Sequence, residues 1–196
     1  MATHATPIPR QAWSVLIVST VAFTVCFMVW MMFGVIGIPL KKTLGLSATE
    51  FGLLTATPVL TGSLIRVPLG IWTDRYGGRI VMTLLMAATV PAIWLMAYAT
   101  AYWHFLVIGL FVGLAGGSFS VGTPYVARWF PKARQGMAMG VYGAGNSGSA
   151  VNKFVAPALL VAFGWTMVPQ VYAAIMLGTL ILFWICLLYT SDAADE

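Results

Sequence analysis

Charged side chains are scarce in this sequence. Of its 196 residues only 8% are Asp, Glu, Lys or Arg, whereas 60% are hydrophobic; an ordinary soluble domain carries about 25% charged residues. A soluble fold would need polar groups to cover its surface, and they are missing, so we expect lipid to take the place of water. The composition excludes a soluble globular protein.

Residues that catalyse reactions or bind metals are also few. Cys26 and Cys186 lie within apolar runs, where cysteine behaves as a small hydrophobic residue. His4 and His104 stand far apart, and no His, Asp and Glu residues cluster around either. We therefore expect no metal site, no cofactor and no enzymatic activity, because acid–base and metal chemistry need such clusters.

The string Gly143-Ala-Gly-Asn-Ser-Gly148 matches the dinucleotide-binding pattern G-x-G-x-x-G, but its context is wrong. No strand precedes it, and Val168 occupies the place of the ribose-binding acid. We expect its glycines to allow close helix packing instead. The same explanation is proposed for four glycines further upstream: Gly113, Gly116, Gly117 and Gly122.

Four long stretches are almost free of charge, with Arg66 and Lys153 as the only charged residues inside them. A bilayer core needs about 20 apolar residues per helix, so the stretches predict an all-α membrane protein with six transmembrane helices. We place residues 1–12 in a cytoplasmic N-terminus, residues 13–189 in the bundle, and residues 190–196 in a polar tail that resembles a truncation or assembly scar. The expected helices span residues 13–40, 51–73, 79–99, 102–127, 136–162 and 166–189.

The basic residues between these helices predict the orientation. Only Lys41 and Lys42 lie on one side of the predicted membrane. Six basic residues lie on the other side: Arg10, Arg75, Arg79, Arg128, Lys132 and Arg134. The positive-inside rule then places both termini in the cytoplasm, in an inner membrane. The net charge of +5 is thus a signal of topology, and we expect no nucleic-acid partner.

The loop from Gly70 to Arg79 carries a specific pattern, G-x-x-x-D-R-x-G-G-R, with Asp74, Arg75, Gly77 and Gly78 inside it. Gly70 would allow close packing at the helix end, Gly77 and Gly78 a tight turn, and Asp74 with the two arginines a charged latch. The loop resembles the signature between helices two and three of the major facilitator superfamily. The resemblance implies one half of such a transporter, built from inverted 3+3 helix repeats, with the substrate near the membrane midplane.

Two cations inside the predicted helices point to the substrate. An arginine at a helix centre costs about 2.5–3.5 kcal/mol on insertion scales. Asp74 is the only acid in residues 51–191, and it lies about 12 Å along a helix from Arg66, too far for a direct pair. The missing anion is therefore expected to be the transported species. Arg66 offers a fork for a planar oxyanion, unless it snorkels or binds backbone carbonyls. Lys153 has either a substrate or coupling role, or faces water or an acid elsewhere.

Further polar and aromatic residues complete a predicted pocket. Asn146, Ser149 and Lys153 follow at i, i+3 and i+7, which places them on one helical face. Phe119 follows a glycine-rich stretch, where its ring either stacks on a planar anion or packs the helix.

Longer strings around these positions resemble the nitrate/nitrite porter family over almost the whole chain. They are residues 63–70, residues 113–119, Trp129-Phe-Pro-Lys132 and residues 143–148. The resemblance implies that Arg66 holds nitrate or nitrite, that Phe119 and Asn146 line the site, and that a second arginine comes from a C-terminal half. The implied mechanism is alternating access with either proton symport or nitrate/nitrite exchange. The alternatives are a facilitator of another small anion and a half-size, non-transporting membrane subunit that acts with a partner or second copy.

Overall fold

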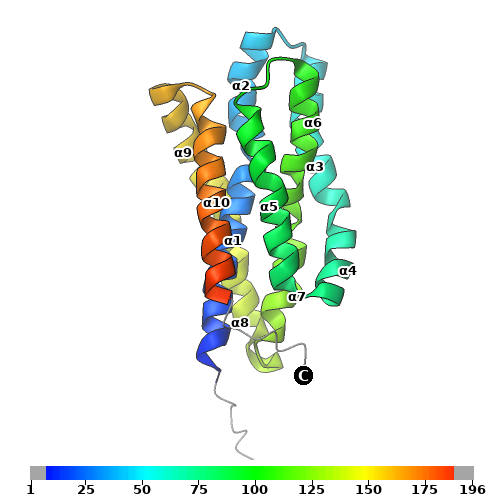
Figure 1. Ribbon diagram of the computed structural model, residues 1–196, viewed down its shortest axis with the longest axis vertical. Helices are drawn as coiled ribbons and strands as arrows, with labels where there is room; N and C mark the ends of the chain where they lie inside the picture. The colour runs from blue at the N-terminus through cyan, green and yellow to red at the C-terminus, as the bar shows by residue number, and fades with distance from the viewer. Residues whose placement is uncertain (1–7, 188–196) are drawn as a thin grey trace, which may run out of the picture.

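The structure is a computed structural model that describes residues 8–187, and these fold into an elongated bundle of helices (Figure 1). The helices join end to end into six rods within this range. The ends of the rods differ from the predicted spans by at most four residues, as at Leu44 and Lys132. The rods comprise α1 (Arg10–Trp30) with α2 (Phe33–Leu44), α3 (Ala48–Leu64) with α4 (Arg66–Tyr76), α5 (Gly78–Met96), α6 (Tyr102–Gly113) with η1 (Leu114–Gly117) and α7 (Ser118–Arg128), α8 (Lys132–Gly143) with η2 (Ala144–Ser147) and α9 (Gly148–Phe163), and α10 (Met167–Leu187).

Five of these rods are long and apolar enough to cross a membrane. The fifth rod along the chain, residues 132–163, is not among them, so length and composition alone do not establish six spans. Its sequence is less apolar because it contains five glycines together with Asn146, Asn152 and Lys153. These polar groups lie in a rod that packs against α1.

Interruptions of the helices follow a repeated pattern. Within the described residues the first, second, fourth and fifth rods are broken near their middles, whereas the third and sixth are continuous. The packing repeats as well, if rods one to three are compared with rods four to six. The second rod packs on the fourth, and its counterpart, the fifth, packs on the first. The third rod, α5, packs on α6, and its counterpart, α10, packs on α1. Two broken rods followed by a straight one, twice over, is the arrangement expected of two three-helix repeats.

At three of the breaks, individual side chains account for missing or altered backbone hydrogen bonds. Pro68 has no N–H for the carbonyl of Leu64, and α3 ends at that residue. At the break between α1 and α2, the side-chain amide of Asn152 donates to the Met31 carbonyl oxygen at 3.0 Å. In η2, Asn146 Nδ2 donates to the carbonyl oxygen of Gly143 at 2.8 Å. Side chains thus satisfy carbonyl groups that a broken helix exposes within the membrane.

The glycine-rich stretches hold the rods close together, as predicted for most of their members. A Cβ atom at Gly145 would meet the Phe23 ring, and one at Gly148 would meet the carbonyl oxygen of Thr24. The prediction was wrong for Gly143, because nothing lies within 4 Å of the place that its Cβ would take. It is confirmed for the four upstream glycines, whose Cβ atoms would meet neighbouring rods: Gly113, Gly116, Gly117 and Gly122.

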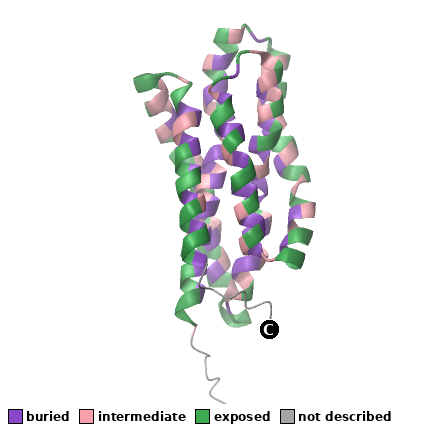
Figure 2. Ribbon diagram, viewed as in Figure 1, coloured by how far each residue is buried: buried purple, intermediate pink, exposed green. Residues whose placement is uncertain are grey.

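Buried residues face the inside of the bundle, and exposed, mostly apolar residues cover its outer faces (Figure 2). The start of α1, the turn between α4 and α5 and the turn between α7 and α8 lie at one end, and the end of α2 lies at the other (Figure 1). The six basic residues of the predicted inner side therefore share one end of the bundle. The polar tail, residues 190–196, lies outside the described residues.

Candidate functional site

Arg66 is the first residue of α4, directly after the break in the second rod. Its side chain is exposed, and the guanidinium carbon lies 6.0 Å from the centroid of the Trp30 ring. Trp30 is the last residue of α1, at the break in the first rod. Arg66 forms no ion pair with any of the residues 8–187. Its positive charge is thus held against an aromatic ring without being neutralised.

Trp30 is held in place by two other rods. Its indole N–H donates a hydrogen bond of 3.0 Å to the carbonyl oxygen of Pro58 in α3. Glycines flank the ring, since a Cβ atom at Gly62 would lie 2.8 Å from the indole nitrogen and one at Gly116 would lie 2.6 Å from the ring. Larger residues at either position would displace the tryptophan.

Phe119 belongs to a cluster of three rings. Its centroid lies 5.5 Å from that of Phe23 and 6.1 Å from that of Tyr142, and the ring is 41% exposed. The Tyr142 hydroxyl donates to the carbonyl oxygen of Ser118 at 2.9 Å, which ties α8 to the start of α7. Phe119 is therefore packed against two rings while part of its own ring remains exposed.

Asn146, Ser149 and Lys153 span the break between η2 and α9. Ser149 Oγ donates to the backbone carbonyl oxygen of Asn146 at 3.1 Å, while the Asn146 amide binds the Gly143 carbonyl oxygen. Asn146 and Lys153 are exposed, Ser149 is partly exposed, and Lys153 makes no ion pair with the described residues. The Asn146 amide carries two N–H donors, so one remains for a further acceptor.

A row of aromatic rings along α1 connects the surroundings of Arg66 with those of Phe119. Trp30 contacts Phe27 at 5.3 Å between centroids, Phe27 contacts Phe23 at 5.7 Å, and Phe23 contacts Phe119. Arg66 lies over Trp30, at one end of this row of rings. Gly145, which precedes Asn146, packs against Phe23. Arg66, Phe119 and, through Gly145, Asn146 therefore lie along the same stretch of α1. Within residues 8–187 no such contact links Ser149 or Lys153 to these rings.

Sequence reasoning missed one buried polar link in this region. Asn152 is buried, donates to the Met31 carbonyl oxygen and accepts a hydrogen bond of 2.8 Å from the Tyr172 hydroxyl. It joins α9 to the break in the first rod and to α10. The signal was an amide side chain within an apolar run, one residue before Lys153.

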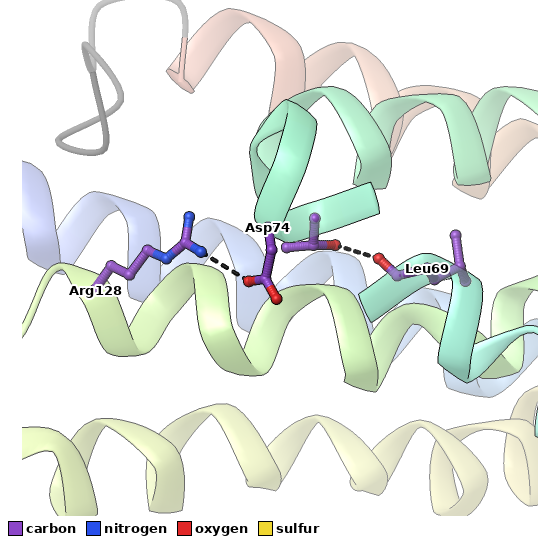
Figure 3. Close-up of polar contacts among 4 residues, drawn as sticks. Leu69, Asp74 and Arg128 are labelled. Atoms are coloured by element: carbon purple, nitrogen blue, oxygen red, sulfur yellow. Dashed lines mark hydrogen bonds and ion pairs between the residues drawn. The ribbon is translucent and has the colours of Figure 1, made fainter. Parts of the chain in front are cut away.

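Asp74 forms an ion pair, but its partner differs from the one predicted for the charged latch. Asp74 pairs with Arg128 on α7, with a distance of 2.8 Å between carboxylate oxygen and guanidinium nitrogen (Figure 3). Arg75 and Arg79, the expected partners, form no ion pair within residues 8–187. Arg79 instead stacks over the Trp184 ring at 4.3 Å. The side chains of Asp74 and Arg75 leave the helix in different directions because the residues are consecutive. Asp74 therefore pairs with Arg128 on the facing helix α7.

The glycines of the loop also behave differently from one another. Gly77 has a φ of 82°, a conformation that favours glycine, and makes the turn. Gly78 is the first residue of α5 and packs against the side chain of Tyr125 rather than shaping the turn. The expected close packing at Gly70 was wrong, because nothing lies within 4 Å of where its Cβ would be.

A large cavity of about 500 Å³ lies elsewhere, between α4 and α5. Its lining is apolar and includes Leu69, Trp72 and Leu84. It contains no cation to hold an anion, so we do not assign the substrate to it.

A family model described as the Major Facilitator Superfamily matches residues 18–196. The chain belongs to this superfamily. Its fold agrees with those of solved transporters. One is a bacterial homologue of the human lysosomal transporter Spinster, in an inward-facing and unoccupied conformation. The TM-score is 0.80 at 18% identity, and the match covers 93% of this chain and 43% of that one. The inward-open xylose transporter XylE from E. coli has a TM-score of 0.67 at 18% identity, covering 89% and 48%. The predicted fold class is confirmed.

Curated relatives within the superfamily carry names of nitrate and nitrite transporters. The probable nitrate/nitrite antiporter NarK1 of Thermus thermophilus is 44% identical, over 83% of this chain and 39% of the relative. The nitrite extrusion protein of Bacillus subtilis is 36% identical, over 76% and 38%. The probable nitrate transporter NarT of Staphylococcus carnosus is 30% identical, over 92% and 45%. The chain thus spans about two fifths of the length of these relatives, and the resemblance to a nitrate/nitrite porter is confirmed.

Proposed function

We propose that this chain supplies half of the anion site of a nitrate or nitrite transporter that works by alternating access. The main support for this proposal is the environment of Arg66. It is an exposed cation at a helix break, and no carboxylate among residues 8–187 pairs with it. A membrane helix tolerates such a charge where it faces a cavity and a ligand. We choose nitrate or nitrite as the anion because the relatives are named as transporters of these ions. We place the anion near the helix breaks because Arg66 follows one of them.

Within this site the side chains have different tasks. Arg66 donates two parallel hydrogen bonds to a planar oxyanion, which a lysine could not do. Phe119 offers the exposed part of its ring to the plane of the anion, and Asn146 orients the anion through the amide N–H that Gly143 does not use. The anion is thereby recognised by shape as well as by charge.

Lys153 and Ser149 are assigned to the same pocket, on the α9 side. Lys153 is exposed and unpaired within residues 8–187, so it is a candidate for coupling the anion to a proton. No carboxylate lies in the predicted helices to carry that proton. We therefore favour proton symport through Lys153 and the anion over nitrate/nitrite exchange.

The loop Gly70–Arg79 latches the inward-closed state, with Asp74 bound to Arg128. The basic end of the bundle faces the cytoplasm, so that both termini are cytoplasmic and the protein resides in the inner membrane. A second six-helix bundle, either a C-terminal half or a second copy, encloses the site and contributes the opposite wall.

The test is uptake of isotopically labelled nitrate into proteoliposomes containing the full-length transporter. We expect saturable uptake that unlabelled nitrate and nitrite inhibit and that phosphate and lactate do not. Inhibition by phosphate or an organic acid alone would indicate a facilitator of that anion instead. Absence of flux for every anion, with dependence on a separate partner, would indicate a non-transporting subunit.

A further inference from the structure

We propose that Trp30 is a positioning residue for Arg66, holding the guanidinium over its indole ring so that the hydrogen-bond donors stay free for the anion. This inference rests on the proposed function. It is carried by the 6.0 Å distance from the Arg66 guanidinium carbon to the Trp30 ring centroid and by the way the ring is fixed.

The ring is anchored on more than one side. Its N–H is used by the carbonyl oxygen of Pro58, so the polar edge points into α3. Gly62 and Gly116 let α3 and η1 close around the ring, which leaves little room for a different rotamer. Trp30 is therefore a fixed platform, whereas an exposed arginine with a long side chain is flexible.

A ring suits this task better than a carboxylate would. A cation over the face of an aromatic ring is attracted by the ring quadrupole. The ring uses none of the five N–H donors of the guanidinium, which lie in the plane of that group. A carboxylate partner would occupy the same fork that a planar oxyanion needs. The pairing of Arg66 with Trp30 thus compensates part of the cost of the charge and leaves the anion-binding edge open.

The test uses nitrate uptake by the full-length transporter and separates the ring face from the rest of the side chain. Trp30→Phe keeps an aromatic face and loses the N–H, whereas Trp30→Leu loses the face. We expect Trp30→Leu to raise the KM for nitrate by about three- to thirtyfold with the maximal rate nearly unchanged. Trp30→Phe should restore most of the affinity. Trp94→Leu, an exposed tryptophan of α5, is the matched control.

A second measurement guards against misfolding of the leucine variant. Fluorinated tryptophan placed at position 30 alone keeps the shape and the N–H of the residue but lowers the negative charge on the ring face. We expect the KM for nitrate to rise stepwise with the number of fluorine atoms, and not to change when the same substitution is made at Trp94.

The outcomes separate the two proposals. A KM that moves neither with Trp30→Leu nor with fluorination, in a transporter that takes up nitrate, would overturn the role of Trp30 alone. Equal loss in Trp30→Phe and Trp30→Leu, without a fluorination trend, would reduce Trp30 to a packing residue. A wild type that takes up no nitrate would overturn the proposed function and this inference with it.

Discussion

Asp74 on α4 and Arg128 on α7 form an ion pair of 2.8 Å at the basic end of the bundle. Both side chains are partly in solvent, 66% and 38% exposed respectively. A pair of this kind contributes only about 0–1 kcal/mol to stability. The same bond, however, ties the end of α4 to the end of α7, which suits a contact that is made and broken during transport.

Asp74→Asn should therefore slow transport clearly while leaving the melting temperature almost unchanged. Uptake assays and thermal unfolding in detergent check both quantities. Arg75→Gln is the control, because Arg75 lies in the same turn and forms no ion pair within residues 8–187. The latch is refuted if Arg75→Gln slows uptake as much as Asp74→Asn does.

Gly148→Ala should destabilise the bundle by about 1–3 kcal/mol, the usual cost of overpacking. Its new methyl group would meet the backbone of Thr24 and Met28 in α1, which moves less easily than a side chain. Gly143→Ala lies in the same motif and meets nothing within 4 Å, so it should leave stability unchanged or raise it. Melting temperatures of the two variants test this, and equal values would contradict the packing described here.

Asn152→Leu should cost more stability than Tyr172→Phe. The first removes hydrogen bonds to Met31 and Tyr172, and the second removes only one of them. Interhelical hydrogen bonds in membranes contribute about 0.6 kcal/mol on average and up to about 1.7 kcal/mol. Thermal unfolding gives the ranking. If Tyr172→Phe proves the more harmful, Asn152 is not the centre of this link.

Lys153→Gln should lower nitrate uptake and flatten its dependence on external pH. The lysine is exposed on α9 and has no anionic partner in the described part of the chain. Uptake rates measured across a pH series in wild type and variant provide the check. Unchanged uptake together with an unchanged pH profile would leave Lys153 with a structural role only.

The rods were predictable because membrane-length runs without charge are a local property of the sequence. The breaks were visible in part: Pro68 and the glycines around Asn146 stand in the sequence, but each run was interpreted as one continuous helix. Whether a proline or glycine interrupts a helix depends on partners for the freed carbonyl groups. At Met31 that partner is Asn152, 121 residues away.

The site was predictable as a set of residue types, and its contacts were not. Arg66 stood out because a charge within an apolar run needs an explanation. Its neighbour Trp30 comes from a different rod and was one of eight tryptophans. The partner of Asp74 was likewise assigned within its own loop, whereas the fold brings Arg128 to it from α7. Local spacing cannot identify partners that packing supplies.

The most direct test of the central claim compares nitrate binding by wild type and Arg66→Lys in the full-length transporter. Lysine keeps the charge and loses the planar fork. Hydrogen bonds to charged groups contribute about 1.5–3 kcal/mol, so we expect affinity to fall by about ten- to a hundredfold. Nitrate bound by Arg66→Lys with wild-type affinity would contradict the assignment of Arg66 as the anion-binding residue.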